Sequence, residues 1–327
     1  MKAMKVCIYG AGAIGGWIGS GLAHAGCSVS VVARGATLDA LQLHGLRLRA
    51  GHQVTSQAVA SSDTPADLGV QDLVVLAVKA PSLPDVARQI APLLGPQTVV
   101  LTAMNGVPWW FLQGFGGTLA GTRLTSVDPD GTLAGALPVQ RIVGGVVHAS
   151  CSVDEPGQVC HHFGNKLILG EPSGEKTGRV QQLAALLEKS GFEVAVSDQI
   201  QKDIWYKLWG NMTVNPISAL TGATTDLIMN DELVRGFISQ VMLEAKDIGA
   251  RIGIPIDQQP EDRHQITRKL GAFKTSMLQD VEAGKALELD ALVAAVRELG
   301  QLTGVATPFT DALLGLARLK ARVRGLY

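Results

Sequence analysis

A short apolar segment at residues 6–9 runs directly into Gly10-Ala11-Gly12-Ala13-Ile14-Gly15, and an amphipathic stretch follows. The spacing G-x-G-x-x-G between a strand and a helix predicts the turn that binds the diphosphate of a dinucleotide. In such a turn Gly10 permits the tight bend, Gly12 lets a phosphate approach the backbone, and Gly15 allows close packing of the helix on the strand. The N–H groups at the start of the helix then face the phosphates. The chain must therefore begin with a strand–turn–helix–strand unit of a parallel sheet.

The hydrophobic pattern predicts how the chain continues. Apolar runs bounded by turns predict strands at residues 6–9, 28–32, 73–78, 98–101, 142–148, 166–169 and 192–196. Helical periodicity predicts helices at 14–25, 83–94 and 177–189, and later at 200–213, 231–249, 267–283 and 287–303. Because strands cease after Ser197, we predict an α/β fold class. An N-terminal Rossmann-type doubly wound sheet in residues 1–197 binds the cofactor, and an all-α C-terminal domain in residues 198–327 carries the substrate-binding and catalytic groups.

The overall composition excludes several classes of protein. Of the 327 residues, 46% are hydrophobic and 17% are charged, which favours two folded domains over a disordered chain. The formal net charge of −1 provides no global positive field, so we expect no nucleic-acid partner. The apolar runs are too short to span a membrane and no secretion signal is visible, so we expect a cytoplasmic protein without a membrane partner. No histidine or cysteine cluster has the spacing of a metal site. The composition is compatible with a homodimer.

The residues after the second strand distinguish NAD from NADP. Binding of NAD calls for an acidic residue about 20 positions beyond the glycine loop. Here the strand ends in Val32-Ala33-Arg34-Gly35, so the acid is missing and an arginine stands nearby. A guanidinium can bind a 2′-phosphate through paired charge-assisted hydrogen bonds. Arg34 therefore predicts NADP(H), the alternative being an exposed surface arginine.

Two polar residues follow neighbouring strands of the predicted sheet. Lys79 comes after the run at 73–78, and Asn105-Gly106 comes after the strand at 98–101. Ligands bind at the carboxyl edge of open parallel sheets, so both side chains are candidate ligands of cofactor or substrate. The alternatives are an ordinary loop lysine and an Asn-Gly turn. The aromatic run 109–111 just beyond predicts either packing between the domains or an apolar wall of the substrate pocket.

Lys207, Asn211 and Asn215 are spaced four residues apart in an otherwise apolar helical segment. This spacing places all three on one helix face, and Pro216 should end or kink the helix there. The alternative is a solvated polar stripe. Reduction of a carbonyl needs a proton for its oxygen, and a lysine whose pKa is lowered by burial can supply it. The sequence has no Tyr-x-x-x-Lys pair that would do this instead.

In these features the chain resembles the ketopantoate reductase family (2-dehydropantoate 2-reductases). The matching segments are GAGAIGG at 10–16, Arg34, Lys79, Asn105-Gly106, Glu155-Pro156-Gly157, Leu169-Gly170-Glu171, the K-x3-N-x3-N-P run at 207–216, 275–280 and Glu288-Leu289-Asp290. The resemblance implies NADPH-dependent reduction of a 2-oxo acid, typically 2-dehydropantoate to D-pantoate.

The resemblance also implies roles for individual residues. Lys207 would bind the substrate and donate the proton to its carbonyl. The other residues that would line the substrate are Asn105, Asn211, Asn215 and Ser276. The cofactor would contact Gly10, Ala11, Gly12, Ala13, Ile14, Gly15, Arg34, Lys79, Asn105 and Glu288.

Some positions depart from the family pattern. Met104 stands where a glutamine often precedes the Asn-Gly pair, and Thr224-Thr225 stands where a further substrate-contacting asparagine is common. The usual family sequence also lacks the aromatic run at 109–111. A reductase of another branched or aromatic 2-oxo acid is therefore the alternative to a ketopantoate reductase. A protein that binds NADP(H) without catalysis is a second alternative, because the glycine loop and Arg34 fit it equally well.

Overall fold

The computed structural model describes residues 3–327, and the chain divides into two compact units. The first unit comprises the chain up to Met104 together with Thr132–Ile200, and the second comprises Asn105–Gly131 and Gln201–Tyr327. Residues 105–131 thus join the helices although they follow the first strands in sequence. The assignment of cofactor binding to residues 1–197 and of catalysis to residues 198–327 stays a prediction.

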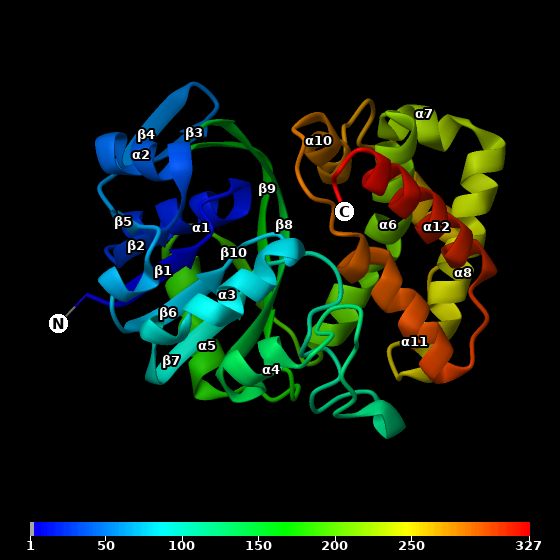
Figure 1. The fold of residues 1–327 in the computed structure, drawn as a ribbon, viewed down its shortest axis with the longest axis horizontal. Helices are drawn as coiled ribbons and strands as arrows, with labels where there is room; N and C mark the ends of the chain where they lie inside the picture. The colour runs from blue at the N-terminus through cyan, green and yellow to red at the C-terminus, as the bar shows by residue number, and fades with distance from the viewer. Residues whose placement is uncertain (1–2) are drawn as a thin grey trace. The chain divides into compact units, whose positions relative to one another are not determined.

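In the described residues the first unit is built on one mixed sheet of ten strands, ordered β4-β3-β9-β8-β7-β6-β1-β2-β5, with β10 beside β9 (Figure 1). The neighbours from β2 through β1, β6 and β7 to β8 are parallel, whereas β8–β9 and β3–β4 are antiparallel pairs. The strands are β1 (Lys5–Tyr9), β2 (Ser28–Val32), β3 (Leu46–Ala50), β4 (Gln53–Gln57), β5 (Ala60–Ser62), β6 (Gln71–Leu76), β7 (Leu94–Thr102), β8 (Ile142–Glu155), β9 (Gln158–Gly170) and β10 (Glu193–Val196). The helices of this unit are α1 (Ala13–His24), α2 (Gly35–His44), α3 (Leu83–Gln89), α4 (Thr132–Ala136) and α5 (Gly178–Lys189).

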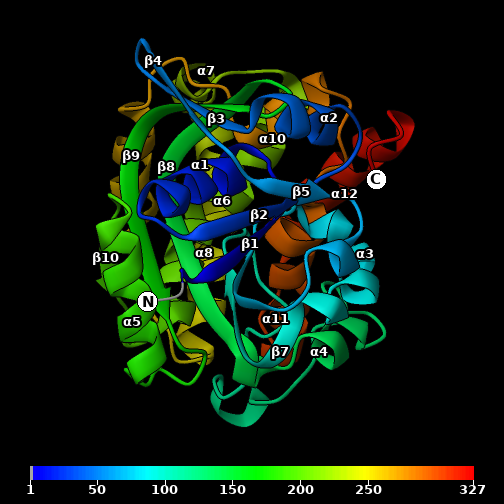
Figure 2. The same cartoon turned by 90° about the vertical axis from the view of Figure 1, so that its left-hand side faces the viewer.

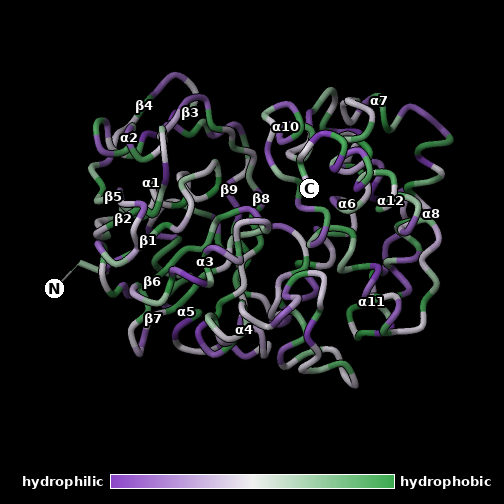
Figure 3. The backbone as a smooth tube through the Cα atoms, in the orientation of Figure 1, coloured by the Kyte–Doolittle hydropathy of each residue, from purple (hydrophilic) through white to green (hydrophobic). Residues whose placement is uncertain are grey.

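The centre of this sheet is its most apolar part. Val6 and Ile8 of β1 and Leu73 of β6 are completely buried, and Figure 3 shows hydrophobic backbone in this region. A strand that is covered on both faces has no reason to alternate polar and apolar side chains. The continuous apolar runs in the sequence are therefore explained by burial on both faces.

The sheet curves around α1, which lies inside the bend (Figure 2). A Cβ on Gly19 of α1 would lie 2.8 Å from the side chain of Ile8 in β1 and 3.1 Å from that of Leu46 in β3. Because β1 and β3 are far apart along the sheet, one turn of α1 can touch both only if the sheet bends around it. On the same helix the Trp17 ring stacks on His161 of β9 at 5.6 Å.

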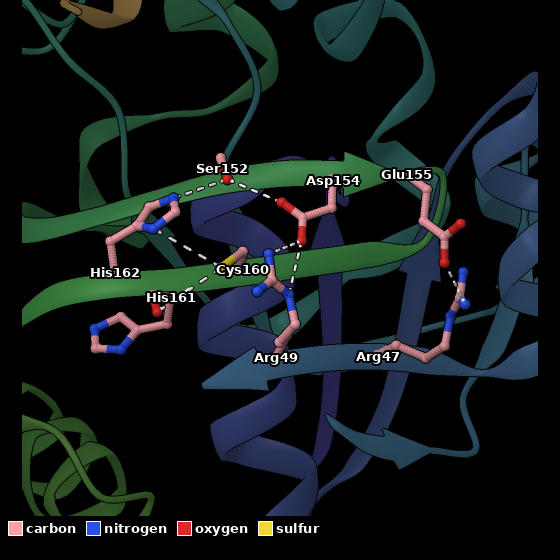
Figure 4. A network of polar contacts seen from close by, with 8 residues as sticks. All are labelled: Arg47, Arg49, Ser152, Asp154, Glu155, Cys160, His161 and His162. Carbon is pink, nitrogen blue, oxygen red and sulfur yellow. Dashed lines mark hydrogen bonds and ion pairs between the residues drawn. The ribbon is translucent and has the colours of Figure 1, made fainter. Parts of the chain in front are cut away.

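The far end of the long β8–β9 hairpin is fixed to β3 by charged side chains (Figure 4). Arg47 donates a 2.8 Å hydrogen bond to Glu155, and the Nε of Arg49 donates a 2.9 Å bond to Asp154. Ser152 Oγ lies 2.8 Å from Nε2 of His162 on the facing strand. These contacts hold the end of the hairpin against β3.

The second unit consists of helices together with the segment 105–131. Its helices are α6 (Ile200–Thr221), α7 (Thr225–Asn230), α8 (Glu232–Arg251), α9 (Pro260–Arg268), α10 (Ser276–Glu282), a π-helical turn (Asp290–Ala294), α11 (Ala295–Thr303) and α12 (Pro308–Val323). The predicted fold class, a Rossmann-type sheet followed by an all-α region, is confirmed. Within residues 3–327, no helix combines the length and hydropathy that crossing a membrane requires.

The structure corrects two local predictions and adds elements that the sequence did not indicate. The helix expected at 267–283 is two helices, α9 and α10, separated by a loop in which Gly271 has a φ of +62°. Pro216 does not end its helix, because α6 continues to Thr221 through a stretch that is almost entirely buried. Tertiary burial here outweighs the local preference against helix at a proline. The elements between residues 35 and 62 were not predicted, and neither were α4, α7 and α12.

Candidate functional site

The glycine loop has the shape that its sequence predicts. Gly10 adopts a φ of +100°, and a Cβ there would lie 2.7 Å from Val78 Cγ1. A Cβ on Gly15 would lie 2.0 Å from the carbonyl oxygen of Gly10, so α1 can approach β1 only because residue 15 has no side chain. Around the Cβ position of Gly12, by contrast, no atom lies within 4 Å. Gly12 is the N-cap of α1, and the first turn of α1 contains no acidic residue. The loop thus combines open space with unopposed helix N–H groups, which suits a phosphate.

Arg34 follows β2 and is the N-cap of α2. Its side chain is 65% exposed, and Nη1 lies 3.7 Å from Oδ2 of Asp85 on α3. Burial raises the pKa of Tyr9 at the end of β1, and the positive charge of Arg34 opposes this effect. Lys79 is partly buried and is the N-cap of the short 3-10 turn (Ala80–Ser82) that leads into α3. The ends of β1, β2 and β6 therefore bring two cations to the carboxyl edge of the sheet, next to the glycine loop.

In the second unit, Lys207 and Asn105 form a direct pair. The Nζ of Lys207 donates a 2.9 Å hydrogen bond to Oδ1 of Asn105. Burial lowers the pKa of Lys207 to about 8, the carboxylate of Glu288 raises it, and the guanidinium of Arg263 lowers it. A lysine with this pKa is largely protonated at neutral pH and can still release its proton, as a general acid must.

Asn105 is held in place by contacts of the two residues that follow it. Gly106 has a φ of +82°, and a Cβ there would lie 2.6 Å from the carbonyl oxygen of Ala291. That same oxygen accepts a 2.8 Å hydrogen bond from the N–H of Val107. Ala291 belongs to the π-helical turn that begins two residues after Glu288. Irregular helical turns of this kind often occur at functional sites, and this one sets the position of the Asn105 loop.

Glu298 of α11 fixes the rest of the segment 105–131. Its Oε1 accepts bonds of 2.7 and 2.9 Å from the N–H and hydroxyl of Thr125. Its Oε2 accepts bonds of 2.8 and 2.6 Å from the N–H and hydroxyl of Ser126. The aromatic run 109–111 is also buried in this unit, and the ring of Phe111 lies 6.1 Å from that of Trp205 on α6.

The structure brings several of the predicted site residues of the second unit together. Since α6 is continuous from Ile200 to Thr221, Lys207, Asn211 and Asn215 share one face of it, and Asn215 is buried. Glu288 is also buried, and its charge acts on Lys207. Ser276 is an exposed residue at the start of α10, and none of the hydrogen bonds described above involves it.

Two further residues bear on the site. The Oγ1 of Thr225 donates a 2.6 Å bond to the carbonyl of Gly271 and holds α7 to the loop between α9 and α10. Arg263 of α9 acts on Lys207 and was not singled out from the sequence, where it stands in a charged stretch. Only the contact of its side chain with Gly210 of α6 reveals it. Across residues 3–327 no group of three or more histidine, cysteine, aspartate or glutamate side chains could hold a metal ion.

Comparison with known proteins identifies the family of the chain. A family model described as ketopantoate reductase PanE/ApbA matches residues 6–174, and the model of its C-terminal region matches residues 199–321. The chain belongs to the ketopantoate reductase family. The family resemblance predicted from the sequence is thus confirmed, and with it membership of a group of oxidoreductases.

Relatives of known name or structure match over the whole length. The 2-dehydropantoate 2-reductase of Mesorhizobium japonicum is 48% identical over 99% of this chain and 100% of its own. The crystal structure of a candidate ketopantoate reductase from Ralstonia solanacearum MolK2 is 53% identical, has a TM-score of 0.96 and covers 100% of both chains. D-mandelate dehydrogenase, solved with NADH and anilino(oxo)acetate, has a TM-score of 0.84 at 22% identity over 99% of this chain and 100% of its own, which shows a shared fold.

Proposed function

We propose that this ketopantoate reductase family member reduces 2-dehydropantoate to D-pantoate with NADPH. The observation that carries the proposal is the Lys207–Asn105 pair: a lysine with a pKa lowered to about 8 is fixed by a 2.9 Å hydrogen bond to an amide oxygen. The 48% identity to a 2-dehydropantoate 2-reductase over the full chain supports the same substrate.

The glycine loop fits a dinucleotide, because the space around Gly12 is open and a Cβ would partly fill it. The residues that would hold NADPH are the loop 10–15, Arg34 on the 2′-phosphate, Lys79, Asn105 and Glu288. When bound, NADPH supplies the hydride that the carbonyl carbon receives. The exposed guanidinium of Arg34 and the absence of an acid at the end of β2 favour NADPH over NADH.

The residues of the second unit supply the proton and orient the substrate. As the carbonyl carbon gains the hydride, its oxygen gains negative charge, and the ammonium of Lys207 transfers one proton to that oxygen. The hydroxyl product and neutral Lys207 result, and Lys207 then regains a proton from water. Asn105 keeps Nζ in one orientation, while Asn211, Asn215 and Ser276 would bind the substrate's polar groups.

The first alternative is a reductase of another branched or aromatic 2-oxo acid, which the departures at Met104 and Thr224-Thr225 favour. The second is a protein that binds NADP(H) without catalysis. A homodimer is also part of the proposal, and light scattering of the purified chain would measure it.

NADPH and NADH oxidation by the purified chain with 2-dehydropantoate, 2-oxoisovalerate and phenylpyruvate tests the proposal. We expect the highest kcat/KM for 2-dehydropantoate with NADPH, and a kcat lower by roughly 10²–10⁴ in Lys207→Met. A tenfold preference for phenylpyruvate would select the first alternative. NADPH binding without oxidation by any of the three acids would select the second.

A further inference from the structure

A second cation lies beside Lys207 in the helical unit. The guanidinium of Arg263 on α9 lies over the ring of Tyr206, with Cζ 5.3 Å from the ring centroid. The guanidinium of Arg263 also lies against Gly210. A Cβ on Gly210 would lie 2.6 Å from Nε and 2.8 Å from Nη2 of Arg263. Tyr206 and Gly210 flank Lys207 along α6, and the charge of Arg263 acts on Lys207.

Arg263 is held in a fixed position. The Tyr206 hydroxyl donates a 2.6 Å hydrogen bond to Gln258, which orients the ring under the guanidinium. Glycine is unfavourable inside a helix, but any side chain at residue 210 would occupy the space that the guanidinium fills. The local sequence of α6 thus accommodates an arginine supplied by another helix.

This well-positioned guanidinium has no acidic partner among the residues that the structure describes. Arg268, on the same helix, pairs with Glu261 at 2.7 Å, whereas within residues 3–327 no ion pair involves Arg263. The Nε of Arg263 is buried and, within residues 3–327, donates no hydrogen bond. A buried donor without an acceptor costs free energy, and an acceptor supplied by a bound molecule would remove that cost.

We propose that Arg263 binds the carboxylate of the 2-oxo acid substrate, an inference that rests on the proposed function. In a 2-oxo acid the carboxylate is bonded directly to the carbonyl carbon. If the carbonyl oxygen receives its proton from Lys207, the carboxylate must lie within a few ångströms of that lysine. Arg263 is the neighbouring cation without an anionic partner in the described structure, and a guanidinium matches the planar geometry of a carboxylate.

The same contact would help to select the substrate. Without substrate, the positive charge of Arg263 lowers the pKa of Lys207. The substrate carboxylate would offset that positive charge when it binds to Arg263. Binding of the acid would thereby favour protonated Lys207. A neutral carbonyl compound would leave the guanidinium without its acceptor, and it would bind more weakly than the acid.

The test compares an acid with a neutral compound of the same carbon skeleton. Arg263→Gln, Arg263→Lys and the control Arg268→Gln would be assayed with 2-oxoisovalerate and with its methyl ester. We expect Arg263→Gln to lower kcat/KM for the acid by about 10–100-fold, mainly through KM, and to change kcat/KM for the ester by less than about threefold. Arg263→Lys should lie between Arg263→Gln and the wild type, and Arg268→Gln should behave like the wild type.

Binding and folding are measured on the same proteins. Calorimetric titration with 2-oxoisovalerate in the presence of NADP⁺ should show the same weakening in Arg263→Gln, while the Kd of NADPH and the Tm stay close to wild type. An equal loss for acid and ester, or full retention of acid binding, would overturn the role of Arg263. If the wild type binds the acid but reduces none of the 2-oxo acids, the proposed function is wrong, and the calorimetric comparison alone decides the role of Arg263. If the wild type binds no 2-oxo acid, both are wrong.

Discussion

Oδ1 of Asn105 accepts a 2.9 Å hydrogen bond from Nζ of Lys207, a residue 102 positions further along the chain. Asn105 reaches this place because Gly106 fits closely against Ala291, and Lys207 reaches it because α6 places the residue on its polar face. The pair joins a loop and a helix that the sequence analysis treated separately. It also provides a way to change the pKa of Lys207 by substituting its neighbour.

Asn105→Asp should raise the pKa of Lys207 from its value of about 8. A carboxylate in place of the amide favours the charged ammonium, and such a neighbour shifts a pKa by roughly one to three units. Since Lys207 must be protonated to act as the acid, kcat/KM for reduction falls as the pH rises through the pKa of Lys207. We therefore expect the alkaline limb of the plot of kcat/KM against pH to move to higher pH in the variant. If this limb does not move, it reports the titration of a group other than Lys207.

Glu288→Gln should have the opposite effect on the same limb. The carboxylate of Glu288 raises the pKa of Lys207, so its removal lowers that pKa and moves the limb to lower pH. If Glu288 also contacts the cofactor or substrate, kcat/KM at neutral pH should fall by roughly 1.4–4 kcal/mol in transition-state stabilisation, or one to three decades. The Tm without ligand should change by only a few degrees. A large loss of Tm with kcat/KM near wild type would instead identify Glu288 as a purely structural residue.

Two alanine substitutions in the glycine loop should separate cofactor binding from folding. A Cβ at Gly12 meets no atom of the protein within 4 Å, so Gly12→Ala should keep the Tm of the wild type. It would occupy the space proposed for the diphosphate, and we expect the Kd of NADPH to rise at least about tenfold. A Cβ at Gly15 would overlap the carbonyl oxygen of Gly10, so Gly15→Ala should lower the Tm strongly. Unchanged NADPH affinity in Gly12→Ala would contradict the proposed position of the phosphates.

Much of the first unit could be predicted because its signals are local. The strand, the glycine loop and α1 follow one another within about twenty residues, and burial on both faces produces apolar runs that are easy to recognise. The polar face of α6 was likewise predictable, because the spacing of Lys207, Asn211 and Asn215 alone defines it.

The features that were not predicted depend on distant parts of the chain. β4 is almost fully exposed and has no apolar alternation, and β3 pairs with β9, more than a hundred residues away. Arg263 stands in a charged stretch that resembles any solvated helix, and it is recognised only once its side chain is seen against Gly210. Glu298 likewise helps to attach residues 105–131 to the helical unit through Thr125 and Ser126. No local sequence pattern connects Glu298 with these two distant residues.

Arg34→Ala should weaken NADPH binding selectively. Loss of a charged, paired contact with the 2′-phosphate corresponds to roughly 1.5–3 kcal/mol, or about 10–100-fold in Kd, while the Kd of NADH should stay unchanged. Arg88→Ala is the matched control, because Arg88 pairs with the same Asp85 and lies outside the predicted site. Equal binding of NADH and NADPH by the wild type would show that the prediction of NADP(H) is wrong.

Glu298→Gln should destabilise the helical unit in a pH-dependent way. Burial raises the pKa of Glu298, but the hydrogen bonds from Ser126 and Thr125 outweigh this effect and lower the pKa below its usual value. A carboxyl group with a lowered pKa in the folded state stabilises the fold above its unfolded pKa, and this stability is lost as the pH falls through the folded pKa. At pH 7 we expect Glu298→Gln to lose roughly 2 kcal/mol of unfolding free energy in urea titrations, because hydrogen bonds to a charged acceptor are replaced by weaker ones. The difference from wild type should shrink when the titration is repeated near pH 4.

Glu282→Gln, which removes an exposed pair with Lys274, should change stability by less than about 1 kcal/mol at either pH. A loss that is the same at both pH values would show that the charge of Glu298 does not contribute to the stability.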